Sequence, residues 1–178
     1  FHARVKKYVD CLLTEIRLGG AGAFEGTYDF QRAPLETLYF GGGTPSLLPL
    51  KDFQAIFAAL EECFGFHPDC EVTMEMDPGT FSQETAEALV SFGMVRASVG
   101  IQSLNDEILE ACGRSHSASE AIHALEMLRD AGVKNISADL LSGLPQQSRA
   151  ELISHVRQLT SVGVDHLSVY DLQYEPGT

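Results

Sequence analysis

The sequence has few cysteines, no long hydrophobic run and a shortage of basic residues, and each shortage excludes a class of protein. Its cysteines form neither a CxxC pair nor a metal-ligand spacing, which favours isolated thiols in a reducing compartment; they are Cys11, Cys63, Cys70 and Cys112. The apolar runs are too short to cross a bilayer, so no transmembrane segment is expected. Twelve basic against 25 acidic residues give a net charge of −13, which disfavours nucleic acid and anionic membranes as partners.

Several catalytic and nucleotide-binding motifs are also missing. The glycine run at residues 41–43 is not followed by Gly-Lys-Ser/Thr and does not fit GxGxxG, which disfavours a Walker triphosphate loop and a dinucleotide fingerprint. The six histidines include no HExxH pattern, and no Ser-His-Asp or Cys-His arrangement has a familiar spacing. Hydrolytic and zinc-dependent functions therefore have little support.

What remains is the composition of an ordinary globular domain. A chain of 178 residues with 44% hydrophobic and 21% charged residues can bury one sizeable core. The first residues lack the apolar segment of a signal peptide. Because the chain begins at Phe1 without an initiator Met, we expect an internal piece of a longer protein. The expected location is cytoplasmic, or mitochondrial or plastid if a transit peptide lies upstream.

Helical and strand patterns alternate along the chain. The expected helices are 5–18, ended by Gly19 and Gly20, then 50–64, 83–92 capped by Ser82, 105–112, 119–131 and 148–162. The expected strands are 35–40, 71–76, 95–101, 135–141 and 166–172, with a surface loop at 19–34. Strands separated by helices indicate right-handed βαβ units, so we predict a single α/β domain with five parallel strands.

The most informative stretch is residues 37–45, where an apolar strand opens into three glycines, Thr44 and Pro45. Glycines allow backbone amides and carbonyls to approach a ligand closely. Ligands of parallel α/β folds bind at the carboxyl ends of the strands. Polar residues follow each of the other strands too, at 77–80, 102–103, 142–145 and 170–173. A segment that follows a strand is more often a plain turn than a binding site. We nevertheless expect all five of these strand exits to face one opening.

Three charged side chains stand out as candidates for ligand binding. Glu75 and Asp139 lie within apolar strand sequence, where an unpaired carboxylate is costly, so each needs a partner or a ligand. Carboxylates in such places often bind ribose hydroxyls. Arg114 follows a short helix, where it serves either as a bidentate clamp for a carboxylate or as a surface arginine at the helix end.

Six segments in order resemble the radical SAM enzymes related to oxygen-independent coproporphyrinogen III oxidase, and most of all the HemW-like branch of proposed haem chaperones. The segments are GGGTPS at 41–46, EMDPGT at 75–80, SVGIQS at 98–103, GRSH at 113–116, DLLSGLP at 139–145 and LSVY at 167–170. The resemblance extends over residues 8–178. Val95 and Leu104 depart from the Asn and Phe usual in the family, which affects local packing only.

The resemblance implies a partial (β/α)6 radical SAM barrel that binds S-adenosylmethionine (SAM) and a [4Fe-4S] cluster. By the family pattern, Gly42, Gly43 and Thr44 contact the methionine amino group of SAM. The remaining cofactor-binding positions implied by the family are Glu75 and Asp139 near the ribose, Gln102 at the cofactor and Arg114 at its carboxylate. Hydroxyl acceptors, a guanidinium fork and bare backbone suit these groups chemically.

The Cys-x3-Cys-x2-Cys motif that holds the cluster in this family is absent. We expect the first barrel strand and the cluster loop to lie upstream of Phe1, so residues 1–178 are an incomplete radical SAM core domain with no metal ligand and no catalytic residue of its own. The alternative is an inactive barrel that has lost the cluster. Residues 1–178 alone are expected to be inactive.

For the complete protein, the resemblance implies a haem chaperone that delivers haem to acceptor proteins. The alternative is an oxygen-independent coproporphyrinogen III oxidase, which carries out radical oxidative decarboxylation to protoporphyrinogen IX. The expected partners are haem or a porphyrinogen, haem-acceptor proteins and an electron donor. Whether the protein is an enzyme depends on which alternative holds.

Overall fold

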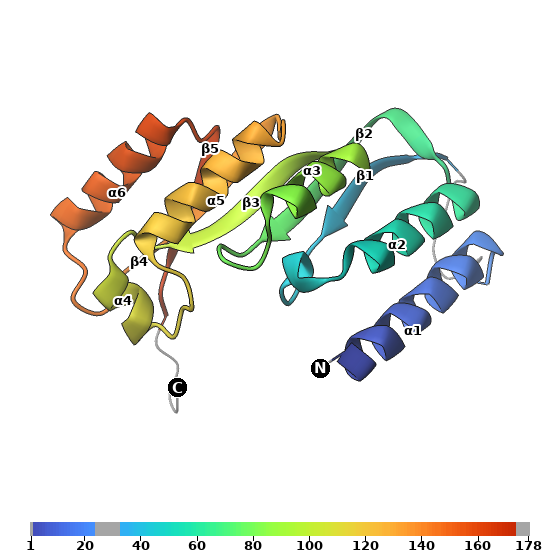
Figure 1. Cartoon of the computed structure of the whole chain (residues 1–178), viewed down its shortest axis with the longest axis horizontal. Helices are drawn as coiled ribbons and strands as arrows, with labels where there is room; N and C mark the ends of the chain where they lie inside the picture. The colour runs from blue at the N-terminus through green and yellow to red at the C-terminus, as the bar shows by residue number, and fades with distance from the viewer. Residues whose placement is uncertain (1, 24–32, 174–178) are drawn as a thin grey trace.

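A computed structural model of the chain describes residues 2–23 and 33–173. Its centre is one sheet of five parallel strands whose order in space follows the chain, and Figure 1 shows the sheet curling into a half-barrel. The strands are β1 (Leu35–Phe40), β2 (Phe66–Met76), β3 (Met94–Gln102), β4 (Asn135–Ser142) and β5 (His166–Asp171). The predicted α/β class and parallel sheet are confirmed.

The helices pack in series against one face of this sheet. They are α1 (His2–Gly20), the 3-10 helix η1 (Pro45–Leu47), α2 (Leu50–Cys63), α3 (Gln83–Ser91), α4 (Asp106–Ala111), α5 (Ala118–Asp130) and α6 (Arg149–Val162). Neighbouring helices contact one another from α1 to α2, α3, α5 and α6, as Figure 1 shows. Because only one face of the sheet is covered in this way, the concave face is left for polar residues.

Side-chain alternation along the strands separates these two faces. Met74 on β2, Val99 on β3 and Leu140 on β4 are fully buried in the core beneath the helices. Glu75 and Asp139 are their chain neighbours and point to the opposite, concave face. Strands of a parallel sheet that is covered on both faces usually have continuous apolar sequences. The alternation of apolar and polar residues seen here therefore agrees with a sheet covered on one face.

Aromatic rings consolidate the core at the β1 end of the sheet. Phe57 of α2 lies between three other rings, with centroid distances of 5.4 Å to Phe40, 6.2 Å to Phe66 and 5.7 Å to Phe92. Phe40 also meets Phe53 edge-on at 5.4 Å. These distances fall in the range favoured by aromatic pairs, so this cluster fixes β1 and the glycine loop that follows it.

Serine caps begin three of the helices and set where the strand connections end. Ser82 accepts a hydrogen bond from the Thr85 amide, as the sequence predicted. Capping boxes at α5 and α6 pair a serine with a glutamate three residues later; they are Ser117 with Glu120, and Ser148 with Glu151. The backbone and side-chain hydrogen bonds from Ser117 lower the pKa of Glu120. A hydrogen bond from Asn105 is the main cause that lowers the pKa of Glu151.

Most predicted boundaries shift by no more than one residue and the first helix begins three residues early, at His2, while two further differences have a structural reason. The first helix does not stop before Gly19 and Gly20 but runs through Gly20, where a Cβ would lie 2.6 Å from the Cβ of Cys63. Gly20 is therefore required by the close approach of α1 and α2 and not by a cap. Strand β2 begins at Phe66, five residues early, because Phe66 pairs with Leu35 before the register shifts. Within the predicted loop 19–34, residues 24–32 lie outside the described part.

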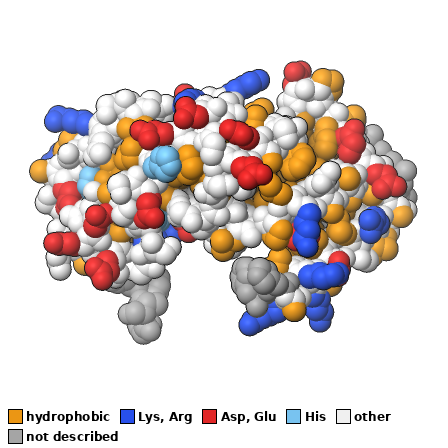
Figure 2. All heavy atoms as spheres, viewed as in Figure 1, with side chains coloured by type: hydrophobic (Ala, Val, Ile, Leu, Met, Phe, Trp, Pro, Cys, Tyr) orange, Lys and Arg blue, Asp and Glu red, His pale blue; other side chains and the backbone are white. Residues whose placement is uncertain are grey.

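Acidic and basic side chains are distributed differently on the helix-covered face. Figure 2 shows acidic side chains spread over this face and several Lys and Arg side chains gathered at the end where α1 lies. Lys6 of α1 pairs with Asp10 one turn later, at 2.9 Å. Within the described ranges, no helix combines the length and the apolar character needed to cross a membrane.

Candidate functional site

A cavity of about 180 Å³ opens at the carboxyl ends of the strands. The loops after β1 and β2, the strands β2, β3 and β4 and the α4–α5 connection all contribute to it, so segments far apart in sequence surround one space. The lining residues are Gly43, Thr44, Pro45, Glu75, Met76, Asp77, Ser98, Gly100, Gln102, Arg114 and Asp139.

The cavity collects most of the residues that the sequence singled out, but not all strand exits. Gly43, Thr44, Glu75, Gln102, Arg114 and Asp139 line it together. Gly42 is not among the lining residues, although its amide donates to Glu75 Oε2 at 3.1 Å. The polar residues after β4 and β5 do not line this cavity in the described part of the chain. The five strand ends therefore do not all converge: the ends of three strands meet at the cavity, together with the strand carboxylates Glu75 and Asp139.

The three glycines of the loop have different surroundings. A Cβ at Gly41 would lie 2.6 Å from the ring of Tyr39 and 3.1 Å from Glu75, so the protein's own packing requires a glycine there. Gly42 has φ +107°, a conformation that other residues rarely adopt. At Gly43 an added Cβ would meet nothing within 4 Å. The space beside Gly43 is therefore open toward the cavity and free for a ligand.

Glu75 is held by two donors from the β1 side. Tyr39 Oη donates to Glu75 Oε1 at 2.9 Å, and the Gly42 amide donates to the other carboxylate oxygen. Desolvation, followed by the hydrogen bond to Glu75, raises the pKa of Tyr39 to about 12. Tyr39 thus keeps its proton at neutral pH and fixes Glu75 as an acceptor on the cavity wall.

Asp139 is the carboxylate that the protein leaves incompletely satisfied. Ser98 Oγ donates to its Oδ2 at 3.0 Å from the neighbouring strand β3. Its Oδ1 is buried and has no hydrogen-bond partner within the described residues. A buried carboxylate oxygen without a donor is costly, and Asp139 lines the cavity, so this carboxylate is a candidate acceptor for a ligand hydroxyl.

Gln102 ends β3 in a strained backbone conformation. Its φ is +65°, and the Ser103 amide donates to the Ile101 carbonyl at 2.8 Å across it, which defines a γ-turn centred on Gln102. Left-handed conformations at residues other than glycine occur preferentially at functional sites. A Cβ on Gly100 would lie 3.1 Å from Gln102 Nε2 and 3.6 Å from Asp77 Oδ1, so a glycine keeps these groups close together.

Arg114 lies at the cavity and not on the outer surface. Its Nη1 donates to Asp77 Oδ1 at 3.2 Å, and the two side chains are 32% and 27% exposed. Of the two interpretations that the sequence left open, the geometry favours the carboxylate clamp, because the guanidinium is held beside the ligand space and keeps donors free.

Five cavity residues were not among the predicted site residues, namely Pro45, Met76, Asp77, Ser98 and Gly100. Of these, Asp77 directly follows β2, and Ser98 and Gly100 lie on β3. Asp77 follows Glu75 by two residues, and Ser98 and Gly100 precede Gln102 at steps of two. Because side chains of a strand alternate between faces, this spacing from Glu75 and Gln102 was the signal that could have found them.

The described residues do not fit an iron–sulfur cluster. No group of three or more His, Cys, Asp or Glu among them could hold a metal ion. Two of the four cysteines are exposed on separate helical segments, Cys11 on α1 and Cys112 at the end of α4. Any cluster ligands would have to come from other residues.

The fold and cavity define a parallel half-barrel that presents acidic, cationic and backbone groups to a polar ligand at its carboxyl edge. The sequence pattern of the Radical SAM superfamily matches residues 26–159, which is most of the chain. The chain therefore belongs to the Radical SAM superfamily.

Relatives of this chain include heme chaperones and coproporphyrinogen III oxidases. Heme chaperone HemW of Synechocystis is 38% identical over 174 residues, covering 98% of this chain and 40% of that protein. Oxygen-independent coproporphyrinogen III oxidase of Bradyrhizobium diazoefficiens is 34% identical over 146 residues, covering 82% and 32%. The solved structure of coproporphyrinogen III oxidase HemN from Escherichia coli superposes with a TM-score of 0.86 and 26% identity, over 97% of this chain and 38% of that one. The chain thus spans less than half the length of these relatives.

SAM is the ligand that the superfamily implies for this cavity. The unpartnered Asp139 Oδ1 matches a hydroxyl donor, the Arg114 guanidinium matches a carboxylate, and Gly43 leaves open space. These donors and acceptors fit SAM. The volume of about 180 Å³ is smaller than the roughly 300–1,000 Å³ of small-molecule sites, so the described residues form part of the site.

Proposed function

We propose that the cavity at the carboxyl edge binds SAM. The buried, unpartnered Oδ1 of Asp139 carries this proposal, because Asp139 and Arg114 line the same cavity. A ligand with hydroxyl donors at one end and a carboxylate at the other satisfies both groups. The proposed contacts are Gly42, Gly43 and Thr44 to the amino group, Arg114 to the carboxylate, Glu75 and Asp139 to the ribose, and Gln102 to the cofactor.

The residues of this chain would orient the ligand and exclude water from it. Tyr39 keeps Glu75 in place as an acceptor, and Ser98 does the same for Asp139. Arg114 would neutralise the ligand carboxylate and fix its direction through its planar donors. SAM bound next to a [4Fe-4S] cluster supplies radical chemistry through reductive cleavage, and the protein supplies orientation.

We further propose that these residues work within a longer protein that supplies the cluster ligands. The share of each relative that the chain spans supports this, being about 40% for HemW of Synechocystis. Residues 1–178 form the incomplete radical SAM core domain in this proposal. Reconstitution of residues 1–178 with iron and sulfide should therefore give no [4Fe-4S] absorption band, and a stable band would contradict this part.

For the whole protein we propose a haem chaperone that passes haem to acceptor proteins, with an electron donor reducing the cluster. The identity of 35–38% to three HemW proteins over 83–98% of the chain supports this choice. The oxidase alternative has support at 34% and 30% identity. We propose a cytoplasmic location or, as the name of the Mus musculus relative suggests for that protein, a mitochondrial one; a plastid location remains part of the proposal.

The experiment that separates these functions uses the full-length protein, reconstituted anaerobically. Coproporphyrinogen III and haem are supplied separately, and decarboxylated product and bound haem are measured. We expect stable haem binding and transfer to an acceptor apoprotein without decarboxylation. Decarboxylation without stable haem binding would overturn the chaperone proposal and establish the oxidase.

A further inference from the structure

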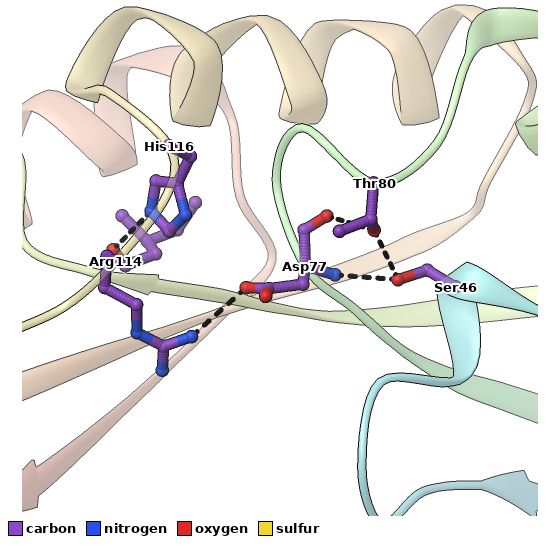
Figure 3. Close-up of polar contacts among 6 residues, drawn as sticks. Ser46, Asp77, Thr80, Arg114 and His116 are labelled. Atoms are coloured by element: carbon purple, nitrogen blue, oxygen red, sulfur yellow. Dashed lines mark hydrogen bonds and ion pairs between the residues drawn. The ribbon is translucent and has the colours of Figure 1, made fainter. Parts of the chain in front are cut away.

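The side chain of Arg114 can act as a clamp only if an interaction holds it over the cavity. It lies on the connection between α4 and α5, directly after Gly113 with φ +70°, and not on a strand. A free arginine side chain samples many rotamers, and a clamp is effective only if few of them remain in the free protein. The ion pair from Nη1 to Asp77 Oδ1 at 3.2 Å selects the rotamer that faces the cavity (Figure 3).

Asp77 is itself held by hydroxyl groups of two loops. Its amide donates to Ser46 Oγ at 3.2 Å, and its carbonyl accepts a hydrogen bond from Thr80 Oγ1 at 2.6 Å. Ser46 Oγ and Thr80 Oγ1 are also hydrogen-bonded at 2.6 Å, and Ser46 is only 3% exposed. The following Pro78 restricts the backbone of Asp77 further. Figure 3 shows the resulting chain of contacts from the η1 turn through Asp77 to Arg114.

The backbone of the Arg114 segment is anchored separately. His116 is 4% exposed, and its Nε2 is hydrogen-bonded to the Ile101 carbonyl at 3.2 Å. That carbonyl belongs to the γ-turn that carries Gln102. Arg114 is therefore fixed at its backbone end by His116 and at its guanidinium end by Asp77.

From this geometry we infer that Asp77 is a positioning residue that holds Arg114 ready for the carboxylate of the ligand, and that Ser46 ties this arrangement to the glycine loop. The inference rests on the proposed SAM site. Ser46 lies two residues after Thr44, so the proposed amino-group loop and the carboxylate clamp keep a fixed separation. This arrangement should increase the affinity for ligands with an amino-acid head group and should not change the affinity for nucleosides without one.

Two opposite effects of the Asp77 carboxylate can be separated by substitution. It orients Arg114, but its negative charge also repels the carboxylate of a ligand. Because both side chains are partly exposed, solvent weakens the repulsion, and orientation dominates. Asp77→Ala removes both effects, whereas Asp77→Asn removes the charge and keeps an oxygen that accepts a hydrogen bond from Arg114.

The test measures dissociation constants of the full-length protein by calorimetry for SAM and for 5′-methylthioadenosine, which lacks the amino-acid head group. Asp77→Ala should weaken SAM binding about tenfold, the loss expected for one charge-assisted hydrogen bond, and leave methylthioadenosine binding unchanged. Asp77→Asn should return SAM affinity to within about threefold of wild type. Asp69→Ala, on the strand β2 that precedes Asp77 and with a side chain 93% exposed, is the matched control and should change neither constant.

Two results would overturn the inference alone while wild-type protein binds SAM. Asp77→Ala binding SAM as tightly as wild type, or more tightly, would mean that the carboxylate competes for Arg114 and does not position it. Equal loss of both ligands in Asp77→Ala and Asp77→Asn would mean that the cavity has collapsed. Failure of wild-type protein to bind SAM would instead overturn the proposed function and this inference with it.

Discussion

The two edges of the sheet treat their charged residues in opposite ways. At the amino edge, Arg129 donates to the carbonyls of Val133, Lys134 and Gly163 and to Asp165 Oδ2, at 2.7–3.2 Å. The same Asp165 oxygen accepts the Ile136 amide at 2.8 Å. At the carboxyl edge, Asp139 Oδ1 has no partner in the described residues. Asp165 at the amino edge is thus paired by groups of the protein itself, whereas we propose that Asp139 at the carboxyl edge is completed by a ligand.

This difference separates stability from binding along each strand. Strand β4 starts beside Asp165, where the hydrogen bond from Ile136, followed by the one from Arg129, lowers the pKa of that carboxyl. Three residues after Ile136, the same strand carries the incompletely satisfied Asp139. In barrels of parallel strands the carboxyl edge carries function and the amino edge contributes stability, and each edge can therefore be altered separately.

The largest effect on stability is expected at Arg129. Arg129→Met removes donors from three main-chain carbonyls and the partner of Asp165, and should lower the free energy of unfolding by about 2–3 kcal/mol. Thermal or urea unfolding measures this loss, and SAM affinity should stay unchanged. Arg157→Met, at an exposed site on α6, is the matched control. A tenfold loss of SAM affinity in Arg129→Met would erase the distinction between the edges.

The same chemical change at the two edges should have opposite consequences. Asp139→Asn should weaken SAM binding about 10- to 100-fold, because the amide no longer offers two acceptors to the ligand, and should leave stability within about 0.5 kcal/mol of wild type. Asp165→Asn should lower stability by about 1–2 kcal/mol and leave SAM affinity unchanged. For both variants, calorimetry measures the SAM affinity and unfolding curves measure the stability. Unchanged SAM affinity in Asp139→Asn would remove that residue from the site.

A smaller effect on binding is expected at the glycine loop. Gly43→Ala places a methyl group in space that is open in the free protein, so the melting temperature should not change. The methyl group would occupy space meant for the ligand, and SAM affinity should fall about fivefold. Normal SAM affinity in this variant would mean that the ligand does not reach Gly43.

The smallest expected effect is on the pH dependence of stability, through His155 of α6. His155 is 5% exposed, and desolvation lowers its pKa, with Glu151 acting in the opposite direction. Since the unfolded chain then binds the proton more tightly, stability is complete above pH about 6.5 and is lost as the pH falls through the lowered value. His155→Gln should flatten this decline in unfolding curves between neutral and acidic pH. His123→Gln, at a side chain 67% exposed, should keep the wild-type decline.

Periodicity predicted the parallel sheet and all five strands, because alternating apolar residues such as Met74 and Val99 mark the covered face. It misplaced the start of β2 at residue 71, because Pro68 and the polar residues around it hide the strand that Leu35 extends by pairing with Phe66. It also took Gly20 for part of a cap, since a close contact with Cys63 on another helix leaves no local signal.

The candidate site was predictable in its residue types but not in its connections. Strand carboxylates such as Glu75 and Asp139 stood out because apolar strands rarely tolerate them. The pairing of Asp77 with Arg114 depends on the loop after β2 meeting the α4–α5 connection in space, and the left-handed backbone of Gln102 lies beside them at the end of β3. No spacing in the sequence encodes such distances.

The most direct test of the account is a crystal structure of the full-length protein grown anaerobically with SAM. We predict that SAM lies in the cavity, with a ligand hydroxyl within hydrogen-bonding distance of Asp139 Oδ1 and the ligand carboxylate against Arg114. SAM bound elsewhere, with Asp139 Oδ1 still lacking a partner, would contradict the central claim that the carboxyl edge is completed by this ligand.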